Sequence, residues 1–227
     1  MTPYYQDDLV TIYLGDAHEW TTPVDVMVTD PPYGVGLSAV SESGYRGAEN
    51  RTRRVVRDPY PDDPTMVRAL IVGVIPGLIA LANRALIFPG PRLMFAYPEP
   101  SGIGAVFTPN GAGRSSWGFQ TTHPILYYGK DPYLTDGKGG RPNGFRDEQP
   151  NRERIAHPCP KPISWMRWAV ARVSREGETV LDPFAGSGTT LVAAKSLGRR
   201  AIGIEIEERY CEIAAQRCSQ EVLGLGA

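Results

Sequence analysis

The sequence predicts an α/β protein built on a mostly parallel, twisted sheet with helices on both faces. A short run of β-branched and apolar residues, 24–29, is typical of a strand that is buried on both sides. The C-terminal part alternates strand and helix patterns at lengths typical of a βαβ unit with a right-handed crossover. Its expected elements are helix 163–175, strand 179–181, glycine turn 182–188, helix 189–197, strand 201–204 and a helix from about 207 to 222.

The region after the first strand predicts a second strand and helix. Residues 65–84 are apolar at helical spacing and follow two aspartates and a proline, which favour a helix start. We expect this helix to be kinked or split at Pro76-Gly77, because proline breaks the helical hydrogen-bond ladder. A further strand is expected over 84–88. The elements of this region therefore continue the α/β pattern.

Loops are expected to concentrate in the middle of the chain. The sequence has 25 glycines and 21 prolines, and half of them fall between residues 89 and 162. These residues favour turns over regular elements. We expect one strand in this segment, at 123–128, and we assign no role to residues 98–117.

Composition limits the class of protein. A chain of 227 residues with 41% hydrophobic and 22% charged residues is typical of one globular domain. The formal net charge of −1 excludes nucleic-acid binding through the overall field, so any such contact must be local. Three cysteines without metal-ligand spacing indicate a reduced, cytoplasmic protein, and no metal site is expected. We expect neither a signal peptide nor a membrane segment, since the longest apolar run, 69–82, is short and contains a proline.

A glycine-rich turn between a predicted strand and a predicted helix is the first chemical motif. Residues 180–190 read VLDPFAGSGTT, and Glu205 ends the next predicted strand. Glycines let the backbone approach a ligand closely, and an acid in that place accepts both hydroxyls of a ribose. Glycine turns also serve packing alone, but this context indicates a nucleoside ligand. Because two threonines and no lysine follow Gly188, a sulfonium fits better than a triphosphate.

The second motif is Asp30-Pro31-Pro32-Tyr33, directly after strand 24–29. One interpretation is structural: an acid that caps the strand, a rigid proline turn and a tyrosine that fills an apolar gap. However, the carboxyl end of a parallel strand faces the crevice where open α/β sheets bind ligands. We therefore expect both motifs to open onto the same edge of the sheet.

With these motifs, the chain resembles the S-adenosylmethionine-dependent methyltransferases that act on exocyclic amines of DNA bases. It is most similar to their permuted β class, in which the catalytic DPPY precedes the cofactor-binding FxGxG, here 184–188. The resemblance covers most of the chain outside 36–62 and 131–155. It implies a single Rossmann-like methyltransferase domain over 1–227, with circularly permuted motif order and a short target-recognition insertion at about 130–156. Three further segments agree with it: YLGD (13–16), ILYYGK (125–130) and HPCPKP (157–162).

The resemblance implies direct methyl transfer to a flipped base. An aromatic amine is a poor nucleophile, because its lone pair is delocalised into the ring. The Asp30 carboxylate and the Pro31 carbonyl would accept the two amino hydrogens and turn the lone pair toward the methyl group. Tyr33 would stack on the base, which is unreachable inside the duplex, and Pro32 would stiffen the wall.

The same resemblance implies the cofactor residues. Glu205 would hold the ribose hydroxyls, the glycine turn would pass beneath the methionine moiety, and Asp16 would contact the adenine end. Thr189, at a helix start, would meet the methionine carboxylate. Lys161 would pair with that carboxylate too, unless it is a solvated surface residue. The complete candidate set is Asp16, Lys161, Asp182, Phe184, Ala185, Gly186, Ser187, Gly188, Thr189 and Glu205.

Two basic stretches are candidates for contacts with DNA phosphates. One follows the catalytic motif, and the other lies within 130–161, where the resemblance places target recognition. The alternative is that both are solvated loops. The recognition insertion is short, which indicates a brief target sequence, relaxed specificity or help from a second subunit. The candidate residues are Arg46, Arg51, Arg53, Arg54, Arg57, Arg141, Arg146, Arg152 and Arg154.

The leading hypothesis is a methyltransferase for the N6 of adenine in double-stranded DNA, because cytosine-N4 enzymes of this kind more often carry serine at the position of Asp30. Cytosine-N4 methylation is the alternative. A catalytically silent DNA-binding relative is disfavoured by the intact Asp30, Tyr33 and Glu205, and methyltransferases for RNA or protein glutamine often begin this motif with asparagine. Pro158-Cys159 resembles the nucleophile site of cytosine-C5 enzymes but lies in a different context. A restriction-modification setting fits the resemblance, although the sequence identifies neither a homodimer nor a partner endonuclease.

Overall fold

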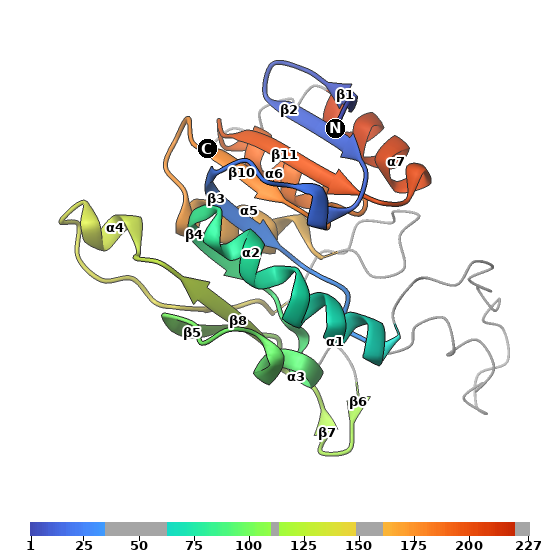
Figure 1. Cartoon of the computed structure of the whole chain (residues 1–227). Helices are drawn as coiled ribbons and strands as arrows, with labels where there is room; N and C mark the ends of the chain where they lie inside the picture. Colours follow the sequence, from blue (N-terminus) through green and yellow to red (C-terminus); the bar gives the residue numbers. More distant parts are fainter. Residues whose placement is uncertain (35–62, 110–113, 149–160, 221–227) are drawn as a thin grey trace, which may run out of the picture.

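The computed structural model describes residues 1–34, 63–109, 114–148 and 161–220, which form a large sheet flanked by helices (Figure 1). Within these residues the sheet has nine strands in the spatial order β1-β2-β11-β10-β3-β4-β8-β5-β9. A separate hairpin is formed by β6 (Arg114–Ser115) and β7 (Gly118–Phe119). The strands of the sheet are β1 (Pro3–Gln6), β2 (Val10–Leu14), β3 (Val24–Thr29), β4 (Ala82–Ile87), β5 (Gly102–Phe107), β8 (Thr122–Tyr128), β9 (Phe145–Arg146), β10 (Thr179–Asp182) and β11 (Arg200–Glu205).

The centre of the sheet is parallel. Strands β2, β11, β10, β3 and β4 all run in one direction. The exceptions are β1, which is antiparallel to β2, and β8, which lies antiparallel between β4 and β5. As a result β5 again points the same way as β4. The predicted mostly parallel α/β fold is therefore confirmed.

Helices cover both faces of the sheet, as the sequence predicts. One apolar cluster joins α5, α6 and α7 to alternate strand residues that include Val26 and Val28. The other joins α1 and α2 to the residues that point the opposite way, such as Met27 and Ile87. Figure 1 shows α1 and α2 in front of the sheet and α5 and α6 behind it. The helices are α1 (Pro64–Gly73), α2 (Ile75–Ala80), α3 (Gly90–Leu93), α4 (Pro132–Thr135), α5 (Ile163–Val173), α6 (Thr189–Ser196) and α7 (Glu208–Ser219), with 3-10 turns η1 (Ala17–Glu19) and η3 (Met94–Ala96).

The predicted helix 65–84 is split into two helices, as expected. Its predicted end is wrong, because the second helix ends at Ala80. The first helix stops at Gly73 and the second begins at Ile75, so the break precedes Pro76. This position suits proline, because the first turn of a helix needs no N–H from it. The chain already enters β4 at Ala82, where the register with Val24 of β3 begins.

The middle segment contains more strand than the sequence predicts. Besides β8, the structure forms β5, which pairs with β8 from Gly102 to Phe107, and the short β9. Glycines at 102 and 104 weaken the strand signal of this stretch, and tertiary pairing overrides it. The strands β1 and β2 were also not expected. Among the described helices, none combines the length and apolar character that a bilayer crossing requires.

One buried ion pair fastens β4 to the loop before β10. The Arg84 guanidinium donates to both carboxylate oxygens of Glu178, each at 2.7 Å, and the two side chains are 10% and 18% exposed. Removing one partner of such a pair leaves an uncompensated buried charge. The pair therefore stabilises the amino edge of the sheet only while both partners are present.

We expect Arg84→Met to lower the free energy of unfolding by about 3 kcal/mol, because Glu178 loses its main partner inside the protein. Urea unfolding followed by circular dichroism measures this loss. The matched control is Lys138→Met, which removes an exposed pair with Asp136 at 3.7 Å and should cost no more than about 0.5 kcal/mol. Equal losses of free energy of unfolding in the two variants would show that the buried Arg84–Glu178 pair stabilises the protein no more than the exposed pair does.

Candidate active site

Four segments converge at the carboxyl edge of the parallel strands. Asp16 follows β2, Pro32 follows β3, Phe184 follows β10 and Glu205 ends β11, and all four residues line one cavity of about 210 Å³. The two sequence motifs therefore open onto the same edge, as predicted. This edge is also where the topology of parallel sheets places ligands.

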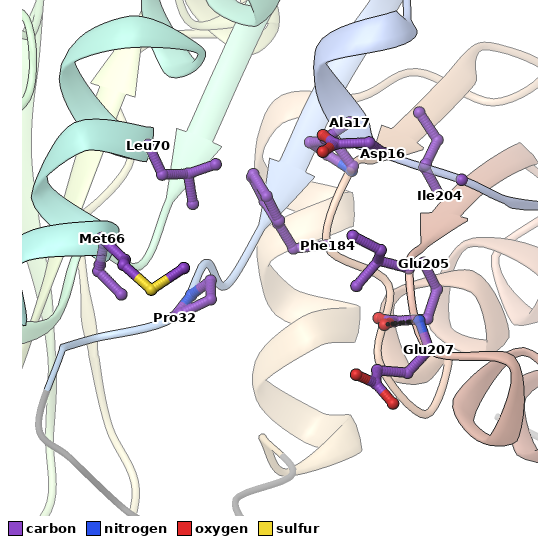
Figure 2. Close-up of a pocket in the computed structure, with 13 residues that line it drawn as sticks. Asp16, Ala17, Pro32, Met66, Leu70, Phe184, Ile204, Glu205 and Glu207 are labelled. Atoms are coloured by element: carbon purple, nitrogen blue, oxygen red, sulfur yellow. Dashed lines mark hydrogen bonds between the residues drawn. The ribbon is translucent and has the colours of Figure 1, made fainter. Parts of the chain in front are cut away.

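Apolar side chains form much of the wall of this cavity. Figure 2 shows Met66 and Leu70 of α1 across the cavity from Glu205 and Glu207. Met66 and Ile206, which also lines the cavity, are 64% and 60% exposed. Large exposed apolar side chains around a hollow are typical of a binding site for a flat, apolar ring.

The glycine turn is fixed from two sides. The Phe184 amide donates to the Asp182 carboxylate at 3.1 Å, and the Ala185 amide donates to the carbonyl of Ile204 at 2.9 Å. Gly188 has φ +77°, and a Cβ there would lie 2.8 Å from the Cβ of Ala214 in α7. Glycine is therefore required where the turn enters α6, for both its conformation and its closeness to α7.

An arginine on the last helix holds the same turn. The Arg217 guanidinium donates to the Ser187 carbonyl at 2.5 Å and to the Thr189 hydroxyl at 3.1 Å. Thr189 is buried, and its hydroxyl is engaged by this arginine. Because Thr189 acts as the acceptor toward Arg217, this contact does not compete with the predicted one, in which Thr189 donates its O–H to a ligand carboxylate.

Asp182 connects the two motifs from inside the core. Its carboxylate is 2% exposed and accepts a hydrogen bond of 2.7 Å from the hydroxyl of Thr29, the last residue of β3. Burial raises the pKa of Asp182 to about 6, and the nearby charge of Asp30 adds to this shift. Asp182 therefore lies beneath the site, and its carboxylate is hydrogen-bonded to neighbouring protein groups.

Glu205 points its carboxylate at the glycine turn. One oxygen accepts the Gly186 amide at 2.8 Å, and the other accepts the Glu207 amide at 2.9 Å. Burial raises the pKa of the Glu205 carboxyl. The Ile206 amide also hydrogen-bonds the carboxylate, so about one of its four acceptor positions remains for a ligand. The side chain is thus oriented by the backbone while it remains able to accept a hydroxyl group from a ligand.

Asp16 lies at the opposite end of the cavity from α1. It caps η1 through the His18 amide at 3.0 Å and lies 2.9 Å from the His18 ring. These hydrogen bonds lower the pKa of the Asp16 carboxyl against the opposing effect of burial. Asp16, Glu205 and Glu207 thus give a mostly apolar wall three acidic groups.

The Asp30-Pro31-Pro32-Tyr33 motif and Lys161 form a compact polar cluster beside the cavity. The Lys161 ammonium lies 2.9 and 2.7 Å from the two carboxylate oxygens of Asp30. The Tyr33 hydroxyl donates to Asp30 and accepts from Lys161. The sequence placed Lys161 with the cofactor residues, whereas the structure places its ammonium on Asp30 and over the Tyr33 ring, 4.6 Å from its centroid.

Two residues that the sequence did not predict shape this cluster. Gly90, at the start of α3, has φ +64°, and a Cβ there would lie 2.7 Å from the Tyr33 ring, so glycine leaves room for the tyrosine. Tyr97 is buried, and its hydroxyl has no hydrogen-bond partner among the described residues. Burial and the charge of Asp30 raise the pKa of Tyr97. Neither residue belongs to a motif that sequence patterns reveal.

The candidate DNA-binding arginines are distributed over different parts of the chain. Arg146 is exposed, lies 3.0 Å from Glu148 and pairs in register with Phe107 at the carboxyl edge of the parallel strands. Arg141 instead bonds Asp131 at 2.6 Å and the Arg172 carbonyl at 2.7 Å, near the start of β4 at the opposite edge. The remaining candidates, Arg46, Arg51, Arg53, Arg54, Arg57, Arg152 and Arg154, lie outside the described residues, as does Cys159.

The sequence of this chain is similar to those of known DNA methyltransferases. Residues 115–216 match the family model of N6/N4 methylases, described as "DNA methylase". The chain is 27% identical to the type II methyltransferase M.ScaI of Streptomyces caespitosus, over 98% of this chain and 86% of that protein. It is 48% identical to M2.DpnII of Streptococcus pneumoniae, but this match covers only 29% of the chain and 24% of the relative.

Solved structures show the same fold. A structure of M1.HpyAVI in complex with S-adenosylmethionine superimposes with a TM-score of 0.64 at 22% identity, over 93% of this chain and all of that one. The PvuII DNA methyltransferase, described as cytosine-N4-specific, gives 0.66 at 15% identity, over 98% and 90% of the two chains. The fold is thus that of a methyltransferase. Residues 115–216 are thus similar to N6/N4 DNA methylases, and the chain shares the fold of these two solved methyltransferases.

We expect the stability of Asp182→Asn, relative to the wild type, to rise with pH. The pKa of this carboxyl is 3.8 when exposed and about 6 in the fold, so burial of the charge costs nothing below pH 3.8 and its full amount above pH 6. Asparagine carries no charge and keeps an acceptor for Thr29. Urea unfolding should show the difference between the two proteins change by about 2 kcal/mol from pH 4.5 to 7. A constant difference over this range would contradict the raised pKa.

Proposed function

We propose that this chain transfers a methyl group from S-adenosylmethionine to the exocyclic N6 of adenine in DNA. One observation carries the proposal. The Asp30 motif at the end of β3 adjoins, through Pro32, the cavity that the glycine turn and Glu205 form at the ends of the two neighbouring strands. A hydrogen-bonding acid for an amine therefore lies next to a site suited to a nucleoside.

The cavity fits the cofactor by the chemistry of its walls. The remaining acceptor position of Glu205 suits a ribose hydroxyl, the apolar groups of Met66, Leu70 and Ile206 suit the adenine ring, and Asp16 suits its amino end. Phe184 and the turn up to Gly188 would lie beneath the methionine moiety. When bound, the cofactor supplies an electrophilic methyl group on a sulfonium.

Asp30 and its neighbours would prepare the nucleophile. The Asp30 carboxylate and the Pro31 carbonyl accept the two amino hydrogens, so the nitrogen lone pair leaves the ring plane and points along the line of transfer. Tyr33 stacks on a base that has left the duplex, because the amine is inaccessible inside the stack. No covalent bond between the base and the protein is required.

The motif order supports a β-class enzyme. Asp30 precedes Phe184 in the chain by most of its length, although their strands β3 and β10 are neighbours in the sheet. In the proposed complex, Arg146 contacts the phosphates of double-stranded DNA. We propose the same role for Arg46, Arg51, Arg53, Arg54, Arg57, Arg152 and Arg154, which lie outside the described residues.

Cytosine N4 is the second candidate target. The structural similarity to the PvuII enzyme, which is described as cytosine-N4-specific, favours it. Cytosine and adenine both present an exocyclic amine beside a ring nitrogen, so the same mechanism applies to either base. The aspartate at position 30, in place of serine, supports adenine.

The deciding experiment identifies the methylated nucleoside. Purified protein is incubated with methyl-labelled S-adenosylmethionine and unmethylated duplex DNA, and the DNA is then digested to nucleosides for mass spectrometry. N6-methyladenine is the expected product. N4-methylcytosine as the product would show that cytosine is the target and that the same mechanism acts on its N4. Bound cofactor without label in the DNA would overturn the proposal.

We expect Asp30→Ala to abolish methyl transfer while cofactor binding stays within about twofold of the wild type. The amine loses its acceptor, and removal of a preorganised group of this kind costs about 10²- to 10⁴-fold in rate. Radiolabel transfer measures the rate, and isothermal titration calorimetry measures cofactor affinity. The complementary variant is Glu205→Gln, which should weaken cofactor affinity about 10- to 100-fold through lost hydrogen bonds to a charged group. Full activity of Asp30→Ala would refute its proposed role.

A further inference from the structure

The Tyr33 hydroxyl bridges an acceptor and a cationic donor. It donates to Oδ1 of Asp30 and accepts from Nζ of Lys161. Lys161 also contacts both oxygens of the same carboxylate, at 2.7 and 2.9 Å. The acceptor and the donor therefore lie side by side and face the same group.

This pattern matches the edge of the proposed target base. Adenine presents an N–H of its amine next to the ring nitrogen N1, and cytosine presents an N–H of its amine next to N3. Flipped bases are read by hydrogen bonds to this edge. Such an edge would donate to Asp30 and accept from Lys161, as the Tyr33 hydroxyl does in the structure.

We propose that Lys161 reads the target base by donating a hydrogen bond to the ring nitrogen beside the reactive amine. The inference rests on the proposed function, and it adds a residue that sets which bases are accepted. When the Tyr33 ring stacks on the base, its hydroxyl leaves the cluster, and the base edge takes over both of its hydrogen bonds. Asp30 and Lys161 then replace the acceptor and donor of the pairing partner that the base has left.

The environment of Lys161 makes this contact selective. Its side chain is 10% exposed and that of Asp30 is 22% exposed, so unmet hydrogen bonds here are not readily replaced by water. Guanine and thymine carry a hydrogen on the corresponding ring nitrogen, which would face the ammonium and accept nothing from it. A site built to form a hydrogen bond rejects such analogues strongly.

A role at the cofactor carboxylate is less consistent with the contacts. The ammonium is held by Asp30 and lies over two aromatic rings, those of Tyr33 at 4.6 Å and Phe88 at 5.9 Å. The glycine turn, by contrast, has its own cation in Arg217. Lys161 is therefore directed toward the target side of the site.

The test changes one atom of the base. Two duplexes carry either adenine or 1-deazaadenine, which has C–H in place of N1, at the position that the product analysis identifies. If the product is N4-methylcytosine, cytosine and 3-deazacytosine take their place. Single-turnover rates are measured for the wild type and for Lys161→Met, which keeps the length of the side chain and removes its N–H groups.

We expect the wild type to methylate the deaza duplex about 10- to 100-fold more slowly than the natural one, the range for a hydrogen bond to a charged group. Lys161→Met should methylate the natural duplex slowly, and its rates on the natural and deaza duplexes should be nearly equal. The matched control is Lys195→Met, which removes a lysine held 2.6 Å from Asp7 in a similar degree of burial and should retain the wild-type ratio.

Three results would overturn the inference. A wild-type ratio near one would show that the ring nitrogen is not read. A Lys161→Met protein that keeps the wild-type ratio but binds S-adenosylmethionine more weakly would assign the lysine to the cofactor. A wild type that methylates neither adenine nor cytosine in natural DNA would remove the proposed function, and this inference would fall with it.

Discussion

The site depends on the parallel pairing of β3 with β10. Val26 and Met27 lie in register with Val180 and Leu181, so the two strands end side by side although 153 residues separate Thr29 from Asp182. The buried hydrogen bond between those two residues fastens the strand ends together. This juxtaposition brings the two motifs together, because the proline turn follows β3 and the glycine turn follows β10.

Acidic groups are concentrated at this edge, and the structure accommodates them in different ways. Asp182 is covered by the protein, Glu205 is oriented by two backbone amides, and Asp30 is paired with a lysine. The charges interact, since Asp30 contributes to the raised pKa of Asp182 and Asp182 to that of Glu205. Such mutual repulsion would be costly in a structural core, and it is typical of a site that binds a cationic ligand.

The sequence predicted the parallel unit and the convergence of its two motifs, because alternating patterns and strand-end residues are local signals. It did not predict β5, whose glycines weaken the local preference, or the break at Val74. The contact between Lys161 and Asp30 was also beyond reach, since it joins residues 131 positions apart. Arg217 and Tyr97 were missed for the same reason: a helix pattern shows which face is apolar but not which polar side chain reaches a distant turn.

The antiparallel direction of β8 divides the segment expected to recognise DNA. Because β8 ends beside the start of β4, residues 130–141 begin at the edge opposite Asp30, and only with β9 does the chain return to the edge where Asp30 lies. At the turn between them, Gly137, Gly139 and Gly140 are exposed and have open space around them. Exposed turns of this kind tolerate insertions. A fluorescent or affinity label placed between Gly137 and Gly140 therefore lies at the edge opposite Asp30, which makes this turn a suitable attachment point for surface immobilisation.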